Sequence, residues 1–328
     1  LGLIGESGAG KSTIGLAALA YGRGGVRITG GEVLLDGENI LAFGGRGIRG
    51  VRGRRVCYVA QSAAAAFNPA HRLGDQVIEA AVRHGTLTRS QAWERARYLF
   101  GVLGLPEPDT FGKRYPHQVS GGQLQRAMTA MALCPGPELI VFDEPTTALD
   151  VTTQIDVLAA IKRAIEETET AALYITHDLA VVAQISDDIM VLRHGNMVEY
   201  GPVQQIIEAP QQDYTRELVS VRQIQKQEAG NQSDALIRID RVDASYSNHF
   251  KVLHDVAVHV PRGQTLAVVG ESGSGKSTLA RMLVGLERPT SGAMTIGGKD
   301  AAALAAEGSR AFGRAIQYVF QDPVASLN

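Results

Sequence analysis

The stretch Gly5-Glu6-Ser7-Gly8-Ala9-Gly10-Lys11-Ser12-Thr13 fits the pattern G-x-x-x-x-G-K-[ST], which is typical of a phosphate-binding P-loop. The apolar run Leu1 to Ile4 leads into it like the end of a buried strand, and Ile14 to Tyr21 favours a helix after it. In such a loop the backbone N–H groups and the lysine hold phosphates, and the hydroxyl of Ser12 would bind Mg²⁺. The expected ligands of a nucleoside triphosphate are Gly5, Ser7, Gly8, Gly10, Lys11, Ser12 and Thr13.

The same loop returns at Gly270 to Thr278 and differs only where Ser274 replaces Ala9. Further along, Tyr58-Val59-Ala60-Gln61 returns as Tyr318-Val319-Phe320-Gln321. An internal repeat of this kind indicates two copies of one nucleotide-binding module. The second copy has its own candidate ligands, which are Gly270, Ser272, Gly273, Gly275, Lys276, Ser277 and Thr278.

The repeat also predicts the domain organisation. We expect a first module over residues 1–221 that lacks its N-terminal strands, and the N-terminal part of a second module over residues 236–328. Residues 222–235 are polar without an apolar period, which is typical of a linker. The sequence begins at Leu1 inside an apparent core strand and ends at Asn328 inside a repeated motif, so both modules are expected to be incomplete pieces of a longer protein.

The composition is ordinary for a globular protein, with 45% hydrophobic and 20% charged residues and a net charge of −2. This balance gives no basic surface for nucleic acid, so we expect no nucleic-acid partner. No apolar run approaches the roughly 20 residues of a membrane helix, so we expect no membrane span. Cys57 and Cys134 fit no metal-binding spacing and are expected to be buried.

Gln61 follows Val56 to Ala60, a predicted buried strand. A glutamine there can bind a metal-bound water and sense the γ-phosphate, or it can be a plain polar cap of the strand. Because this glutamine recurs as Gln321 in the second copy, the functional role is favoured over that of a strand cap. We therefore expect a catalytic and metal-binding role for Gln61 beside Ser12, and a metal site formed by Gln321 and Ser277 in the second copy.

Carboxylates follow the next buried run, Leu139 to Phe142. In a P-loop protein the first of them, Asp143, is expected to bind Mg²⁺ together with Ser12. The second, Glu144, can orient and activate water for attack on the γ-phosphate. His177 ends another apolar run, and strand ends of open α/β sheets meet at one edge, so we expect His177 in the same crevice rather than in a purely structural role.

Ser120-Gly121-Gly122-Gln123 precedes a predicted helix, Leu124 to Leu133. Small residues at a helix start leave N–H groups and the positive end of the helix dipole exposed, which suits an anion. The alternative is a simple serine cap with a flexible turn. A second anion site in a chain that already has a P-loop calls for an explanation.

Tyr246 lies between the predicted strands Leu236 to Val242 and Val252 to Val260, where it could stack on an adenine ring or be an ordinary strand aromatic. Leu266 to Val269 is predicted as the strand before the second P-loop, and the basic stretch Arg46 to Arg55 as a solvated loop. Other expected elements are a strand and turn over 33–37, helices over 75–84 and 90–103, a capping box of Thr88 with Gln91, a helix over 151–165, a hairpin over 189–199 and a short helix over 203–209.

The motifs occur in an order that resembles the ABC ATPases. The P-loop, Gln61, Ser120 to Gln123, Asp143-Glu144, Ala148-Leu149-Asp150 and His177 resemble that family's Walker A, Q-loop, signature, Walker B, D-loop and switch-histidine motifs. Further stretches resemble the dipeptide, oligopeptide and nickel importer branch, and the second half resembles the partner ATPase of the same systems; these are residues 27–32, 115–118, 199–202 and 208–218, then 285–292 and 321–323. The whole resembles a fusion of two ATPases.

The resemblance implies an α/β P-loop NTPase fold with a mostly parallel core sheet, an antiparallel β subdomain and a helical subdomain. It implies binding of ATP and Mg²⁺, and ATP hydrolysis that powers import of peptides or related solutes such as glutathione or nickel. The implied partners are two transmembrane permease subunits and, through them, a substrate-binding protein. The protein would lie at the cytoplasmic face of the inner membrane as a peripheral subunit. The alternative is a soluble ABC ATPase that acts on ribosomes or DNA.

In that family two modules pair head to tail, so that each ATP lies between the P-loop of one module and the signature of the other. The resemblance therefore implies that Ser120, Gly121, Gly122 and Gln123 face the nucleotide at Lys276 and Ser277. This pairing within one chain would account for the second anion site.

Overall fold

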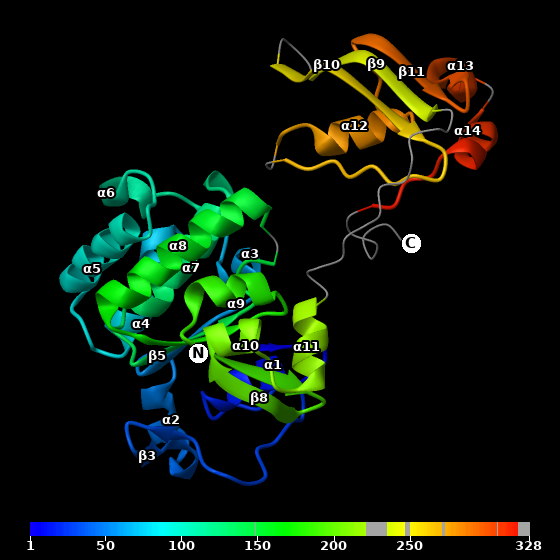
Figure 1. Ribbon diagram of the computed structural model, residues 1–328. Coiled ribbons are helices and arrows are strands. Elements are labelled where there is room, and N and C mark those ends of the chain that lie inside the picture. The colour runs from blue at the N-terminus through cyan, green and yellow to red at the C-terminus, as the bar shows by residue number, and fades with distance from the viewer. Residues whose placement is uncertain (148, 221–234, 247–249, 271–272, 307, 321–328) are drawn as a thin grey trace. The chain divides into compact units, whose positions relative to one another are not determined.

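The computed structural model describes residues 1–147, 149–220, 235–246, 250–270, 273–306 and 308–320. Contacts divide the chain into two compact units, Leu1–Ile224 and Gln225–Asn328, and each is described by itself (Figure 1). Three residues of the predicted sites, Ala148, Ser272 and Gln321, lie outside the described residues, as does the predicted linker except for Ala235. The module boundaries predicted from the repeat stay a prediction.

Unit 1 is built on a six-stranded sheet with the order β4-β5-β6-β1-β7-β8. Its strands are β1 (Gly2–Gly5), β4 (Val56–Val59), β5 (Leu139–Asp143), β6 (Ala171–Ile175), β7 (Asp188–Arg193) and β8 (Asn196–Pro202). All neighbours are parallel except the hairpin of β7 and β8. The expected mostly parallel core sheet and the expected hairpin are confirmed.

Apolar runs explain why these segments form central strands. Ile140, Val141 and Phe142 of β5 are fully buried, as is Leu3 of β1. Burial on both faces is typical of parallel strands, which helices cover from either side. Helix α1 (Lys11–Ala17) packs against β1, β5 and β6, and the longer helix α8 (Val151–Thr168) packs against α7 (Gly121–Leu133) and α9 (Leu179–Ile185).

A helical part of unit 1 lies beyond β4. It contains α3 (Ala63–Ala66), α4 (Leu73–Arg83), α5 (Arg89–Val102) and α6 (Pro108–Phe111), and α4 and α5 pack on each other and on α7 (Figure 1). The predicted capping box is present, because Gln91 N donates to Thr88 Oγ1 and Thr88 N donates to Gln91 Oε1. The remaining short elements are β2 (Leu34–Leu35), β3 (Glu38–Asn39), the 3-10 turns Ile40–Ala42 and Pro116–Gln118, α10 (Val203–Glu208) and α11 (Asp213–Ser220).

The prediction of a solvated loop over Arg46 to Arg55 is wrong for its first part, where Gly45–Val51 forms helix α2. Ile48 and Val51 lie three residues apart, and a helix brings residues at this spacing to one face. Val51 is buried, and Ile48 packs against the same core. Burial of these two apolar residues on one side accounts for a helix here, although the many arginines of the stretch suggest a solvated loop.

Unit 2 has a four-stranded antiparallel sheet with the order β10-β9-β11-β12. Its elements are β9 (Ala235–Tyr246), β10 (Phe250–Pro261), β11 (Ser291–Ile296), β12 (Lys299–Asp300), α12 (Lys276–Leu283), α13 (Ala301–Ala306) and α14 (Ser309–Ala315). Ile239, Val242, Met282 and Phe312 form its core. The antiparallel β subdomain expected from the resemblance is therefore present in this unit.

The predicted strand Leu266 to Val269 is not formed, and Val269 is 87% exposed. In unit 1 the corresponding β1 is paired on both sides, with β6 and with β7. The described part of unit 2 contains no parallel strands that could pair with residues 266–269. A strand needs such partners for its backbone N–H and C=O groups, so apolar sequence alone does not produce one here.

Cys57 and Cys134 are buried and free, as the sequence predicts. Burial raises the pKa of Cys57 to about 12 and that of Cys134 to about 11, so both stay protonated thiols near neutral pH. Among the described helices, none combines the length and the apolar composition that crossing a membrane requires.

Gly15 sets how closely α1 approaches the sheet, and this gives a stability test. A Cβ at Gly15 would lie 2.5 Å from Ile175 Cδ1 and 3.0 Å from Val141 Cγ1, whereas a Cβ at Gly50 of α2 would meet open space. Overpacking costs about 1–3 kcal/mol, and alanine gains up to about 1 kcal/mol in a helix. We predict that Gly15→Ala lowers the free energy of unfolding by about 1 kcal/mol and that Gly50→Ala raises it slightly in urea unfolding. A Gly15→Ala variant as stable as Gly50→Ala would contradict this packing.

Candidate functional site

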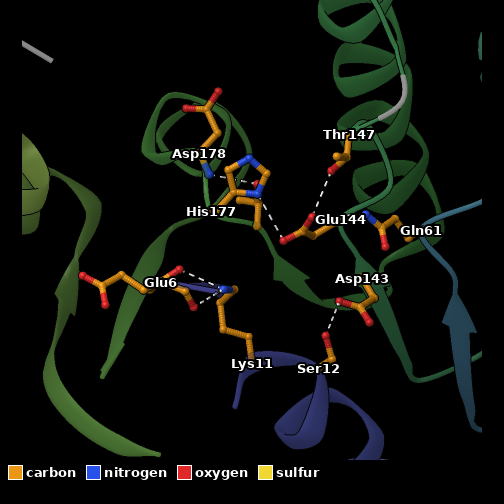
Figure 2. A network of polar contacts seen from close by, with 11 residues as sticks. Glu6, Lys11, Ser12, Gln61, Asp143, Glu144, Thr147, His177 and Asp178 are labelled. Carbon is orange, nitrogen blue, oxygen red and sulfur yellow. Dashed lines mark hydrogen bonds and ion pairs between the residues drawn. The ribbon is translucent and has the colours of Figure 1, made fainter. Parts of the chain in front are cut away.

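The first P-loop begins where β1 ends, at the edge of the sheet where β5 and β6 also end. Glu144 follows β5 and His177 follows β6, so residues that are far apart in the sequence meet at this edge (Figure 2). A cleft of about 380 Å³ lies at this edge; Glu144 lines it, whereas His177 is not among its lining residues and contacts it through Glu144. Its lining residues are Ser7, Gly8, Gly10, Lys11, Ser12, Thr13, Gln61, Asp143 and Glu144.

Lys11 is buried, and the loop itself holds its ammonium group. Its Nζ donates to the carbonyl oxygens of Gly5, at 2.8 Å, and Glu6, at 2.9 Å. Burial lowers the pKa of Lys11, and the carboxylates of Glu144 and Asp143 oppose that shift. The cation is therefore fixed at the wall of the cleft, close to two carboxylates.

Ser12 and Asp143 come together from the loop and from β5. The Ser12 hydroxyl donates to Asp143 Oδ1 at 2.9 Å, and the Tyr58 hydroxyl of β4 donates to Asp143 Oδ2 at 2.5 Å. A hydroxyl beside a carboxylate is a set of hard oxygen donors, which fits Mg²⁺. Gln61 lines the same cleft and adds an amide.

Glu144 is the centre of a polar network (Figure 2). His177 Nδ1 lies 3.1 Å from its Oε1, while Thr147 Oγ1 at 3.1 Å and Gln61 Nε2 at 3.4 Å donate to its Oε2. The backbone of Glu144 has a φ of 48°, in the left-handed region that non-glycine residues seldom adopt. Strain of this kind is found at functional sites, where surrounding contacts maintain it. Its amide supplies such a contact by donating to Ile175 O at 2.9 Å.

Ser120 to Gln123 lie at the start of α7 and are not among the residues that line this cleft. Ser120 caps the helix, because Gln123 N donates to its hydroxyl and its own N–H donates to Gln123 Oε1. Gly122 makes a close approach possible, since a Cβ there would lie 2.4 Å from Thr153 Cγ2 of α8. The structure thus contains the serine cap, and an anion at this helix start stays a prediction.

The described residues of the second P-loop, Gly270 and 273–278, share local features with the first. Gly275 has a φ of 90°, as Gly10 has 98°, and Lys276 Nζ donates to Gly270 O at 2.8 Å. The Tyr246 hydroxyl lies 3.0 Å from Thr278 Oγ1, so this tyrosine is positioned beside the helix that follows the loop. Tyr246 is 45% exposed, and stacking of its ring on an adenine stays a prediction.

Sequence reasoning missed two tyrosines that contact the first site. Tyr58 binds Asp143, and the only available signal was its recurrence as Tyr318. Tyr214 of α11 accepts a hydrogen bond from Glu6 N at 3.4 Å, and Arg193 covers its ring at 4.5 Å. No local pattern marks Tyr214 as a residue that contacts the P-loop.

Comparison with known proteins agrees with this geometry. Residues 1–147 and 253–328, which together make up more than half of the chain, match the profile of the family described as ABC transporter. The chain belongs to the ABC transporter family. Its fold is similar to the solved dimeric structure of the ATP-binding cassette MJ0796 bound to ADP and Pi, with a TM-score of 0.53, 26% identity, and coverage of 62% of this chain and 84% of that one.

Curated relatives of this ABC family member cover nearly all of it. The peptidoglycan transport ATP-binding protein YejF of Agrobacterium fabrum is 34% identical over 99% of this chain and 62% of its own length. The glutathione import ATP-binding protein GsiA of Escherichia coli K12 is 34% identical over 100% of this chain and 60% of its own length. The chain therefore spans about three-fifths of the length of these relatives.

A buried carboxylate, Glu199 of β8, anchors the segment that brings Tyr214 to the P-loop. Its oxygens accept the N–H groups of Gln211, at 2.9 Å, and Gln212, at 3.1 Å. Burial alone would raise the pKa of Glu199, but these amides and the Arg216 charge help to lower it. The carboxylate therefore stabilises the fold in its ionised form.

We predict that Glu199→Gln lowers the free energy of unfolding at pH 7 by about 1–3 kcal/mol, because one backbone amide loses its acceptor. A depressed folded pKa contributes stability above the unfolded value, 4.5, and this contribution disappears as the pH falls through the folded value. The difference between the native chain and the variant should therefore shrink as the pH falls below 4.5 in urea unfolding, and it should vanish once the pH lies below the folded value. Exposed Glu217→Gln is the control, and an equal loss in both variants would contradict the anchor.

Proposed function

We propose that this chain binds and hydrolyses ATP to power import of a peptide or related small solute through separate membrane subunits. The observation that carries the proposal is that Lys11, the Ser12–Asp143 pair and Glu144 line one cleft, with His177 within hydrogen-bonding distance of Glu144. Membership of the ABC transporter family supports it, and so do the roles of the two relatives, in peptidoglycan transport and in glutathione import. These roles favour import over the alternative of action on ribosomes or DNA.

The chain's own residues account for most of the proposed chemistry. Lys11 and the loop N–H groups hold the phosphates, and Ser12, Asp143 and Gln61 are the proposed holders of Mg²⁺. The ion, when bound, neutralises charge that develops on the phosphates. Glu144 orients a water molecule and accepts its proton, which makes the water a nucleophile.

His177 is the proposed contact to the γ-phosphate, and its Nδ1 is already fixed against Glu144. Holding both groups in advance matters because phosphoryl transfer depends mainly on positioning and electrostatic stabilisation. Thr147 and Gln61 add hydrogen bonds to the other oxygen of Glu144, so side chains on both of its oxygens orient this carboxylate.

We also propose that the two units pair head to tail, so that Ser120 to Gln123 bind the nucleotide held at Lys276. The duplicated P-loop and the position of Ser120 to Gln123 at the N-terminus of α7 support this pairing. Tethering in one chain would raise the effective concentration of the two halves to about millimolar. On the same proposal two permease subunits and a substrate-binding protein select the solute, and the protein lies at the cytoplasmic face of the inner membrane.

Glu144→Gln tests the proposed base. The amide keeps the size of the side chain but cannot accept the proton, so ATP turnover by the full-length protein should fall about 10²–10⁴-fold while binding of a fluorescent ATP analogue is retained. Glu166→Gln, on an exposed position of α8, is the matched control and should keep native turnover. Undiminished hydrolysis at the first site of Glu144→Gln would refute the assignment.

Disulfide crosslinking tests the proposed pairing. Both native cysteines are buried, so introduced thiols should react without interference. We predict that Ser120→Cys with Ser274→Cys forms a disulfide within one chain when Mg-ATP is present, as detected by mass spectrometry of the digest. Ser120→Cys with Ser7→Cys, which places the second thiol in the first P-loop, should not crosslink within one chain. The reverse preference would contradict head-to-tail pairing.

A further inference from the structure

Asp143 has both carboxylate oxygens engaged by side-chain hydroxyls from different elements. Ser12 of the P-loop binds Oδ1 at 2.9 Å, and Tyr58 of β4 binds Oδ2 at 2.5 Å. Asp143 is only 9% exposed, so without Tyr58 its Oδ2 atom would lie in a poorly solvated position without this donor. A buried carboxylate oxygen without a donor is costly, which makes the Tyr58 contact a strong constraint.

We propose that the Tyr58 hydroxyl is a positioning group that fixes the Asp143 carboxylate for Mg²⁺ and thereby sets the metal affinity of the first ATP site. This inference rests on the proposed ATP-binding function. Outer partners of metal ligands orient those ligands, and their removal weakens metal binding. Tyr58 would act through Asp143 and would not touch the nucleotide itself.

The register of the sheet explains how this contact arises. Tyr58 of β4 is paired with Val141 of β5, and Asp143 lies two residues further along the same strand. Side chains two residues apart share one face of a sheet, so Tyr58 and Asp143 lie on the same face. The long phenol side chain spans the diagonal between them, which a smaller hydroxyl residue at position 58 could not do.

The phenol is held in the form that donates. The ordinary pKa of a tyrosine hydroxyl is about 10. The hydroxyl therefore keeps its proton at neutral pH and presents it to the carboxylate. The second copy of the module keeps a tyrosine at the matching place, Tyr318, although Phe320 stands where the first copy has Ala60. A position that needed only apolar bulk would not require the hydroxyl in both copies.

The test measures metal binding without turnover. The experiment uses the full chain carrying Lys276→Ala, so that the fluorescent probe MANT-ATP reports binding at the first P-loop alone. The fluorescence of the probe is followed while Mg²⁺ is added, and it is also recorded in EDTA. We predict that Tyr58→Phe raises the Mg²⁺ midpoint about tenfold. Its affinity for the nucleotide in EDTA should stay within about twofold of the parent, because the P-loop contacts of Lys11 are untouched. Tyr58→Met, with a flexible apolar side chain, is a second variant with the same expected shift.

Tyr98→Phe is the matched control, since the Tyr98 hydroxyl also donates to a carboxylate, that of Glu167, at 2.9 Å between helices α5 and α8. Its Mg²⁺ midpoint should equal that of the parent. A midpoint for Tyr58→Phe within about twofold of the parent, a lowered midpoint, or an equal shift in the Tyr98 control would overturn the positioning role while leaving ATP binding intact. Failure of the parent chain to bind the nucleotide at all would overturn the proposed function and this inference with it.

Discussion

The site of unit 1 depends on the pairing of one short strand, β1, with β6 on one side and β7 on the other. Every backbone group of a buried strand needs a partner, so this double ladder fixes where β1 ends and where the P-loop begins. Gly5 passes so close to β7 that a Cβ there would lie 2.2 Å from Leu192 O. The sheet therefore sets the distance of Lys11 and Ser12 from the ends of β5 and β6.

The two copies of the P-loop separate local from long-range causes. Gly10 and Gly275 have nearly the same left-handed φ, and the lysine of each loop donates to the first glycine carbonyl at 2.8 Å. These features follow from the loop sequence itself. Residues 266–269 have the same apolar character as β1 but form no strand, because the described part of unit 2 offers no parallel partners. The local sequence thus determines the conformation of the loop, whereas pairing with distant strands determines whether the preceding apolar segment forms a strand.

The same distinction explains what could be predicted from the sequence. The parallel core, the strand end at Asp143, the strand just before His177 and the Thr88 capping box follow from apolar runs and short motifs, and the structure has them. Helix α2 was not predicted, because arginines surround its two apolar residues, Ile48 and Val51. The contacts of Tyr58 with Asp143 and of Tyr214 with Glu6 join residues 85 and 208 positions apart, and no local pattern encodes such pairs.

Strand β4 and the segment after it connect both carboxylates at the end of β5. Tyr58 donates to Asp143, and Gln61, three residues later, donates to Glu144. Close-packed interiors transmit displacements rather than absorb them, so a shift of β4 along β5 would lengthen both hydrogen bonds together. The residues after Gln61 form the short helix α3, which packs on α7, the helix that begins at Ser120. On the proposed function, a force applied at α3 would therefore reach the metal-binding carboxylate, the water-orienting carboxylate and the helix that starts at Ser120 through one continuous set of contacts.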